Sequence, residues 1–195
     1  MLCFPPARKQ RHRQRTVKKR KIPIVSIVGR SNTGKTTLIE KMIRELTARG
    51  YRVATIKHNL HGFDIDHPGK DSWRHREAGA RLTVLASPKK VAVIRDVDRD
   101  YGIDEIRDRY VEDVDIILVE GYKENDFPKI EVFRSALGHK LLSKKQDNLI
   151  AVASDRPLVV DVPCLDLNDA RGIVDMVEMR FLKKKAKKGS VKSHR

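Results

Sequence analysis

The segment IPIVSIVGRSNTGKTTLIEKMIRELTARG, residues 22–50, decides the fold of this chain. Its first part, 22–29, is a continuous apolar run rich in β-branched residues, which is typical of a strand buried on both faces of a sheet. Its last part, 36–50, carries apolar residues at helical spacing and ends in Gly50, which is placed to close the helix in the left-handed conformation. The segment therefore predicts a buried strand, a tight turn and an amphipathic helix.

The turn between strand and helix matches the phosphate-binding pattern G-x-x-x-x-G-K-[ST]. The matching residues are Gly29, Gly34, Lys35 and Thr36. The pattern is a strong signal here because a buried strand precedes it and an amphipathic helix follows it. Gly29 lets the chain leave the strand sharply, and Gly34 lets main-chain amides approach phosphate oxygens. We expect the main-chain amides of residues 32–37, including those of Asn32 and Thr33, to form a concave anion site at the start of this helix.

Three side chains of the turn complete a site for a nucleoside triphosphate. Lys35 supplies a positive charge for the β- and γ-phosphates, and the Thr36 hydroxyl is the expected Mg²⁺ ligand. Thr37 is placed to contact the α-phosphate. The alternative is a glycine-rich turn with an exposed lysine, and such a turn would rarely fall between this strand and this helix.

Strands and helices alternate through the rest of the chain. The expected strands are 51–58, 82–87, 91–97, 115–121, 128–134 (as an edge strand), 148–154 and 157–163. The expected helices are 72–80, 102–114 with Ile103, Ile106 and Tyr110 inward, and a last one that Asn168 opens. The sequence therefore predicts an α/β fold of the P-loop NTPase type, with a mostly parallel sheet covered by helices on both faces.

Two basic arms flank the predicted domain, which spans 22–182. Residues 1–21 hold nine Lys or Arg and no acid, and residues 183–195 hold seven and no acid. These cations account for the whole net charge of +16, so the domain itself is neutral. Arms with so few apolar residues are expected to be disordered. The alternative is a weak, salt-sensitive grip on RNA, DNA or an acidic partner.

Composition also bounds where the protein works. No apolar run approaches 18 residues, so we expect no transmembrane helix and no membrane contact. The N-terminus lacks the apolar stretch of a secretory signal. The two cysteines, Cys3 and Cys164, lie far apart in the sequence and form no metal-ligand pair. A cytoplasmic protein is the expectation.

Acidic residues follow the predicted strands at the edge where the phosphate loop lies. Glu120 ends the apolar strand 115–121, which is the place for a magnesium-side carboxylate or a group that orders the attacking water. Asp64 and Asp66 follow the strand that ends at His58 and would reach the metal through water. Glu120 and Asp66 are therefore the candidate catalytic and metal-binding acids, and the alternative is a strand-end acid in an ordinary ion pair.

Other residues bear on base choice and on turnover. Asp155 ends the strand 148–154, where a carboxylate would accept two hydrogen bonds from guanine that adenine cannot donate. The usual Asn-Lys-x-Asp form is missing, and the alternative is an aspartate that starts a turn. Arg30 and Arg134 are the candidate arginines for transition-state charge, although neither is an obvious arginine finger.

Residues 57–80 are rich in histidine and aspartate. They include His58, His61, His67 and His75. Taken alone, this density fits either a transition-metal site or a polar loop, since the histidines do not form a helical pair and no cysteine joins them.

The same segment resembles the signature of the MobB family, the adapter proteins of molybdopterin-guanine dinucleotide biosynthesis. The matching run is Lys57-His58, His61, Phe63, Asp66 and Pro68-Gly69-Lys70-Asp71-Ser72. Other motifs agree in order: GRSNTGKTTLIEKMI (29–43), VEGYK (119–123), PKIEVFR (128–134) and NLIAVASD (148–155). The resemblance spans about residues 22–180 and leaves the basic arms outside.

The resemblance implies a homodimeric P-loop protein of the dethiobiotin-synthetase-like branch that binds GTP and Mg²⁺ and hydrolyses GTP slowly at most. Its implied partner is the guanylyltransferase that joins GMP to molybdopterin. By position, Lys35 and Thr36 would hold phosphate and magnesium, with Asp66 and Glu120 on the metal side. Residues at the same edge would bind the pterin phosphate, molybdopterin, its guanine dinucleotide or the partner, and they are Lys57, His58, His61, Lys70 and Lys123.

Two other functions stay open from the residues themselves. One is an accessory GTPase that loads nickel or zinc into an enzyme and holds the metal on His58, His61 and His67. The other is a P-loop kinase for a small molecule or a nucleic acid, guided to its substrate by the basic arms.

Overall fold

The computed structural model describes residues 21–183 except 60 and 123–124. The predicted arms 1–21 and 183–195 lie outside the described residues apart from Lys21 and Lys183. Within the described part, no helix is long and apolar enough to cross a membrane.

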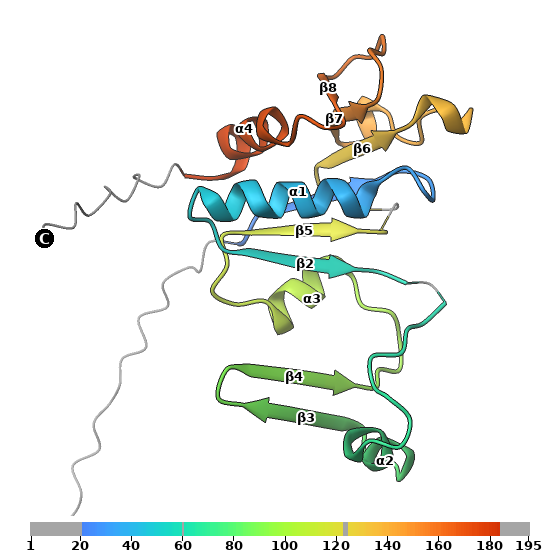
Figure 1. Ribbon diagram of the computed structural model, residues 1–195, viewed down its shortest axis with the longest axis vertical. Helices are drawn as coiled ribbons and strands as arrows, with labels where there is room; N and C mark the ends of the chain where they lie inside the picture. Colours follow the sequence, from blue (N-terminus) through green and yellow to red (C-terminus); the bar gives the residue numbers. More distant parts are fainter. Residues whose placement is uncertain (1–20, 60, 123–124, 184–195) are drawn as a thin grey trace, which may run out of the picture.

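A parallel sheet of six strands forms the centre of the protein (Figure 1). Its strands, in spatial order, are β2 (Val53–Lys57), β5 (Ile116–Glu120), β1 (Ile24–Val28), β6 (Lys129–Phe133), β7 (Leu149–Ser154) and β8 (Cys164–Asp166). All their pairings are parallel. The predicted α/β class with a mostly parallel sheet is therefore confirmed.

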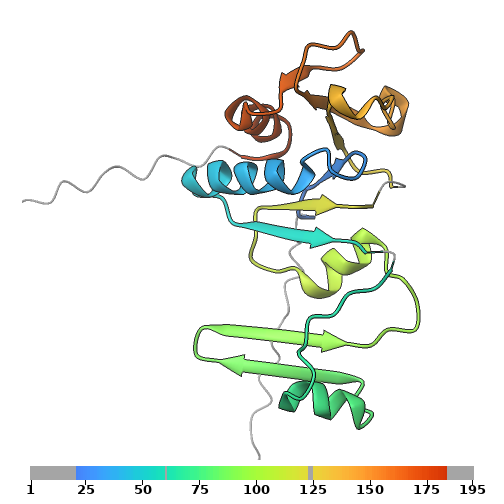
Figure 2. The same cartoon turned by 45° about the vertical axis from the view of Figure 1, so that its right-hand side comes forward.

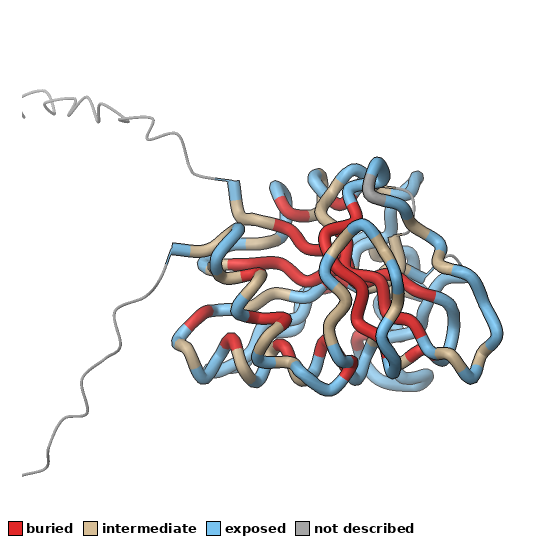
Figure 3. Tube along the Cα trace, turned by 90° about the horizontal axis from the view of Figure 1, so that it is seen from above, coloured by how far each residue is buried: buried red, intermediate tan, exposed pale blue. Residues whose placement is uncertain are grey.

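Helices cover both faces of this sheet, as predicted. On one face, α1 (Lys35–Ala48) and α4 (Ala170–Phe181) pack over the apolar side chains of the central strands. On the other face, Ile103 of α3 (Ile103–Tyr110) packs against residues of β1 and β5. The strands between the two layers form the buried centre of the molecule (Figure 3). Burial of each Leu or Ile side chain there contributes about 1.5–3 kcal/mol to the stability of the fold.

Arg49, just after α1, ties this helix to α4. Its guanidinium lies 2.7 Å from Glu45, 2.7 Å from Asp175 and 2.8 Å from Glu178. The side chain of Arg49 is only 18% exposed, so water screens these ion pairs less than it screens pairs at the surface.

Strand β6 corrects the prediction of an edge strand over 128–134. It lies between β1 and β7, and all five of its residues are buried. Its charged side chains are tolerated because neighbouring loops satisfy them. The ammonium of Lys129 donates to the carbonyls of Asn125 and Asp147, and the carboxylate of Glu131 accepts from the amides of Leu142 and Ser143. Burial lowers the pKa of Lys129.

The segments 82–87 and 91–97 do not join the main sheet. They form an antiparallel hairpin of β3 (Leu82–Ser87) and β4 (Lys90–Arg95), which follows α2 (Asp71–Glu77). The hairpin projects away from the sheet on the side of α3 (Figure 2). Most of its residues are exposed, including Val84 and Val93, which face each other in the register.

Two further sequence predictions are wrong in detail. No strand forms over 157–163; instead Leu158, Val160 and Val162 pack against a cluster of β6 and β7 residues, and β8 follows. Helix α3 ends at Tyr110 rather than near residue 114, and Tyr110, which was predicted to lie inward, is 45% exposed. Short 3₁₀ turns, η1 (Ser135–Leu137) and η2 (Lys145–Asp147), lie between β6 and β7.

Candidate functional site

The phosphate loop joins β1 to α1 at the carboxyl edge of the sheet. Gly29 has φ 144° and Gly34 has φ 99°, backbone conformations that favour glycine. A Cβ at Gly29 would lie 2.6 Å from the carbonyl oxygen of Val132, so strand β6 leaves no room for a side chain there. The helix begins directly after Gly34, with the amide of Leu38 bonded to the Gly34 carbonyl. The first amides of α1 therefore have no carbonyl of an earlier helical turn to bond, as an anion site requires.

The polar side chains of the loop hold its shape. The ammonium of Lys35 donates to the carbonyl of Arg30 at 2.8 Å, and the Thr33 hydroxyl donates to the same carbonyl at 2.9 Å. A phosphate oxygen is a stronger acceptor for Lys35 than this carbonyl because it is charged. Thr36 and Thr37 are exposed at the first turn of α1, where a ligand can reach them.

The structure brings Thr36 and Glu120 together. The Thr36 hydroxyl lies 3.1 Å and 3.2 Å from the two carboxylate oxygens of Glu120. Glu120 is the last residue of β5, and it pairs in register with Ile27 of β1, one strand away. A hydroxyl beside a carboxylate is a pair of hard oxygen donors of the kind that binds Mg²⁺. The residues at this position therefore fit a magnesium ion bound with the phosphates of a nucleotide.

Arg134 brings a second positive charge to the loop. It follows β6, and its Nε donates to the carbonyl of Thr33 at 2.9 Å. Its guanidinium lies 3.4 Å from the position that a Cβ on Gly34 would take. The other candidate arginine, Arg30, is exposed and contributes its carbonyl to the contacts of the loop.

Asp155 lies at the same edge, after β7, and is bonded to Ser135. Its carboxylate accepts from the Ser135 amide at 3.0 Å and 3.2 Å and from the Ser135 hydroxyl at 3.1 Å. The amide hydrogen bond is the main reason why the pKa of Asp155 lies below its ordinary value. Because Ser135 directly follows Arg134, this contact also fixes the turn that carries the arginine.

The backbone of His58 is hydrogen-bonded to that of Glu120, but the His58 side chain contacts other residues. Its amide donates to the Glu120 carbonyl at 2.9 Å, whereas its Nε2 lies 2.9 Å from Asp100. The imidazole stacks on Tyr122 with 4.0 Å between ring centroids, and the Tyr122 hydroxyl donates to the Tyr101 carbonyl at 2.6 Å. No motif in the sequence indicates this group, because its members come from three separate loops.

The contacts of Asp66 lie within its own loop. Its Oδ1 accepts from the Ser72 hydroxyl at 2.8 Å and from the His67 amide at 3.0 Å. Its Oδ2 is buried and has no hydrogen-bond partner among the described residues. These contacts place Asp66 in the turn before α2 rather than in the pair formed by Thr36 and Glu120.

The other predicted ligands of substrate or partner are dispersed. Lys57 ends β2, next to Glu120 in the register, and is exposed. His61 and Lys70 are exposed in the loop before α2. Lys123 lies outside the described residues. Within the described part of the chain, no three or more His, Cys, Asp or Glu residues gather into a group that could hold a metal ion, so nothing described there supports a nickel or zinc site.

Comparison with known proteins gives consistent matches. The sequence model of the family described as "Molybdopterin guanine dinucleotide synthesis protein B" matches residues 24–155. The chain is 42% identical over 160 residues to the molybdopterin-guanine dinucleotide biosynthesis adapter protein of Escherichia coli (strain K12), covering 80% of this chain and 91% of that protein. It is 39% identical over 158 residues to the protein of the same name from Haemophilus influenzae, covering 80% and 88%. A crystal structure of molybdopterin-guanine biosynthesis protein B (mobB) superimposes with a TM-score of 0.64 at 30% identity, covering 80% of this chain and 98% of that one.

Proposed function

The chain belongs to the MobB family, and from this premise we propose that it is a GTP-binding adapter that assists the attachment of GMP to molybdopterin. Its relatives are named as adapter proteins of molybdopterin-guanine dinucleotide biosynthesis, which supports a role in making the molybdenum cofactor. The observation that carries the nucleotide part of the proposal is the contact of Thr36 with Glu120 beside the phosphate loop.

The proposed binding mode uses the loop as an anion cradle. The phosphates would accept hydrogen bonds from the amides of the first turn of α1 and from those of Asn32, Thr33 and Gly34, which precede the helix. The helix dipole would add to this attraction. Lys35 would leave the Arg30 carbonyl for the β- and γ-phosphates. Thr36 and Glu120 would hold Mg²⁺, which neutralises phosphate charge when bound.

The geometry favours slow hydrolysis at most. Fast hydrolysis needs an ordered water and added positive charge at the transferred phosphate. Glu120 is engaged by Thr36, and Asp66 is engaged by Ser72 and His67, so either carboxylate would have to change partners to order water. Arg134 supplies the positive charge, but its Nε is bonded to the Thr33 carbonyl of the loop itself.

We assign guanine selection to Asp155. Both of its oxygens accept from Ser135, yet a carboxylate has about four lone-pair sites and can accept further hydrogen bonds. An aspartate is ionised at neutral pH, as an acceptor for the two guanine donors must be, and the Ser135 amide, which lowers the pKa of Asp155, favours that form.

The partner surface and the dimer are assigned to different parts of the protein. The exposed residues Lys57, His61 and Lys70, together with His58 and with Lys123, which lies outside the described residues, would meet the guanylyltransferase or the phosphate of molybdopterin. The hairpin would form the homodimer contact, because Val84, Val91 and Val93 are 55%, 64% and 53% exposed. Apolar residues clustered this way on a surface commonly mark a protein interface.

Calorimetric titration with GTP and ATP, each with and without Mg²⁺, tests the nucleotide assignment. We expect GTP to bind more tightly than ATP, and Mg²⁺ to strengthen binding. The Lys35→Ala variant should bind GTP about a hundredfold more weakly, since it loses a charge-assisted contact at the phosphates. Equal GTP affinity in the variant and the unaltered protein would remove the phosphate-loop assignment. Binding of the guanylyltransferase in a pull-down with purified components tests the adapter role separately.

A further inference from the structure

The side chains of His58 and Tyr122 form a cluster with the loop that leads from the hairpin to α3. The two rings stack with 4.0 Å between their centroids and 19° between their planes. At the outer ends of the rings, His58 Nε2 lies 2.9 Å from the carboxylate of Asp100, and the Tyr122 hydroxyl donates to the Tyr101 carbonyl at 2.6 Å. We call these four residues the His58 cluster. Its two rings are thus bonded to consecutive residues of one loop.

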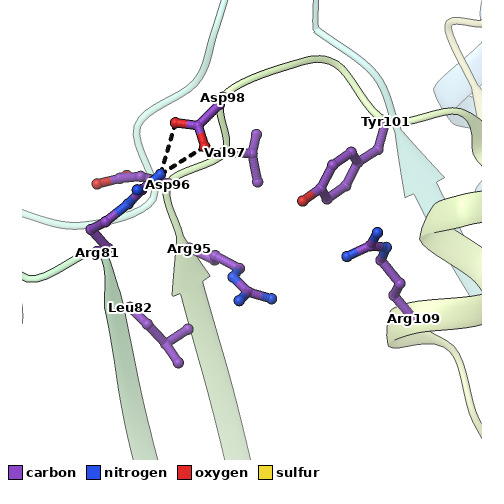
Figure 4. Close-up of a pocket in the computed structure, with 8 residues that line it drawn as sticks. All are labelled: Arg81, Leu82, Arg95, Asp96, Val97, Asp98, Tyr101 and Arg109. Carbon is purple, nitrogen blue, oxygen red and sulfur yellow. Dashed lines mark hydrogen bonds and ion pairs between the residues drawn. The ribbon is translucent and has the colours of Figure 1, made fainter.

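The loop that holds the two rings is itself fixed by contacts with α3. The guanidinium groups of Arg99 and Arg109 lie 4.8 Å and 4.9 Å from the centroid of the Tyr101 ring. Figure 4 shows Arg109, which comes from α3, beside this ring. Glu105 of the same helix lies 2.7 Å from both arginines. Asp100 and Tyr101 are therefore firm points of attachment for the stacked rings.

The His58 cluster lies directly beyond the strand end that carries Glu120. Glu120 pairs in register with Lys57 at the end of β2, and the next amide, that of His58, donates to the Glu120 carbonyl at 2.9 Å. Gly121 has φ 111°, and a Cβ there would lie 2.7 Å from the carbonyl oxygen of His58. The chains that leave β2 and β5 therefore stay in close contact from the Glu120 hydrogen bond to the ring stack at Tyr122.

The position of the Glu120 carboxylate depends on this backbone. The carboxylate lies 3.1 Å and 3.2 Å from the Thr36 hydroxyl, and a strand end that frays after Glu120 would let it move away. A metal ligand has to be held to within about 0.5 Å of its productive position. The ring stack opposes fraying because it fixes the chain at Tyr122, two residues after Glu120.

We propose that His58 and Tyr122 are positioning residues, whose ring stack holds the Glu120 carboxylate against Thr36 in the arrangement that binds Mg²⁺ with a nucleotide. The proposal rests on the proposed function, since it assigns a support to the metal side of the same site. Both residues act through Glu120 and need not touch the nucleotide. The role of His58 inside the protein is separate from the contact with substrate or partner that its place in the sequence suggests.

The first test uses the full chain without nucleotide or metal and measures the amide signals in two-dimensional ¹H–¹⁵N NMR. Glu120→Gln provides the reference shift, because it replaces the carboxylate that contacts Thr36. We expect His58→Ala and Tyr122→Ala to shift the Thr36 amide in the same direction as Glu120→Gln. His139→Ala, which removes an exposed histidine from another loop, is the control and should leave the Thr36 amide in place.

The second test measures how much Mg²⁺ is needed to strengthen GTP binding. Residues that orient a metal ligand change metal affinity about 10–100-fold when replaced, so His58→Ala should raise the half-effective Mg²⁺ concentration about tenfold. GTP affinity without the metal should stay unchanged. Tyr122→Ala should behave alike, and the double variant should be no worse than either single one, because the two rings form one contact.

A conservative variant separates the stack from the hydrogen bond at its edge. His58→Phe keeps an aromatic face on Tyr122 and loses the contact with Asp100. It should therefore retain most of the magnesium effect that His58→Ala loses. Thermal unfolding checks that each variant is folded.

The outcomes distinguish this proposal from the proposed function. An unchanged Thr36 amide in both alanine variants overturns the proposal irrespective of the result with GTP. An unchanged magnesium requirement, equal weakening of GTP with and without the metal, or a loss in His58→Phe as large as in His58→Ala also overturns it. If the unaltered protein shows no magnesium effect on GTP, the proposed nucleotide function fails, and the Thr36 amide alone decides whether the stack positions Glu120.

Discussion

The hydroxyl of Thr36 and the carboxylate of Glu120 lie 3.1 Å and 3.2 Å apart at the head of α1, although 84 residues separate them in the chain. The parallel pairing of β5 with β1 produces this contact, because it brings the carboxyl ends of both strands to one edge. Two oxygen groups suited to bind magnesium therefore lie side by side at this edge of the sheet.

Glu120→Gln should abolish the effect of magnesium on GTP binding. An amide keeps the shape of the side chain but loses the charge that a divalent cation needs, so we expect GTP affinity with Mg²⁺ to fall about tenfold and affinity without it to change little. Calorimetry with and without the metal measures both. Glu40→Gln, on the exposed surface of α1, is the control and should behave like the unaltered protein. A full magnesium effect in Glu120→Gln would exclude Glu120 as a metal-side residue.

Arg134→Lys should lower both GTP affinity and the rate of the proposed slow hydrolysis. Lysine keeps the positive charge but cannot bond the Thr33 carbonyl through Nε and reach past Gly34 at the same time. We expect turnover to fall at least about tenfold, as for other lost transition-state charge contacts. Single-turnover assays with labelled GTP provide the measurement. Unchanged turnover would leave Arg134 a structural contact of the loop.

Asp155→Asn should reduce the preference for GTP over ATP. Asparagine offers one acceptor oxygen where guanine presents two donors, while its Oδ1 can still accept from the Ser135 amide. Competition between the two nucleotides, measured on the same sample, gives the ratio directly. If both nucleotides weaken by the same factor, Asp155 acts by holding the turn at Ser135 and takes no part in base selection.

Arg49→Ala should destabilise the fold without changing nucleotide affinity. The variant removes ion pairs to Glu45, Asp175 and Glu178 at a mostly buried position, and we expect a loss of about 2–3 kcal/mol in the free energy of unfolding. Arg44→Ala on the same helix removes one exposed pair at 3.8 Å and should cost less than about 0.5 kcal/mol. Urea denaturation compares them. Equal losses would show that the buried network adds nothing beyond a surface pair.

If the hairpin forms the proposed homodimer contact, Val93→Glu should shift the protein from dimer to monomer. The residue is exposed on the hairpin opposite Val84, and a charge there is unfavourable once the face is buried against another chain. Sedimentation velocity at micromolar concentration reports the change. Met179→Glu, which alters an 82% exposed apolar residue of α4, is the matched control. A dimer that survives Val93→Glu and dissociates with Met179→Glu would place the contact on α4 instead.

The sequence was sufficient for the parts of the fold that depend on local pattern. The apolar run 22–29 predicts β1, the glycine pattern predicts the loop, and the helical spacing up to Gly50 predicts α1. In the same way, the apolar run before Glu120 predicts β5 and places Glu120 at its carboxyl end. These features are predictable because a strand buried on both faces must be apolar throughout. In a parallel sheet, the carboxyl ends of all strands lie at the same edge, where the ligand binds.

The errors arose where distant loops decide the outcome. The alternation of Lys129 and Glu131 with apolar residues suggested a half-exposed edge, but backbone groups of the loops around 125, 142 and 147 satisfy both charges inside the protein. The stacking of His58 on Tyr122 likewise joins separate loops, and no spacing in the sequence encodes it. Such contacts are set by tertiary packing, which local patterns do not record.

The carbonyl of Val132 occupies the space that a side chain at Gly29 would need, and Arg134 reaches the same turn two residues further along the chain. The phosphate loop is therefore shaped by β6 as much as by its own glycines. A peptide of residues 22–50 would carry the whole motif but neither of these neighbours, and we expect it to bind no nucleotide. The proposed nucleotide site therefore depends on three adjacent strands, β5, β1 and β6, and not on one linear stretch of sequence.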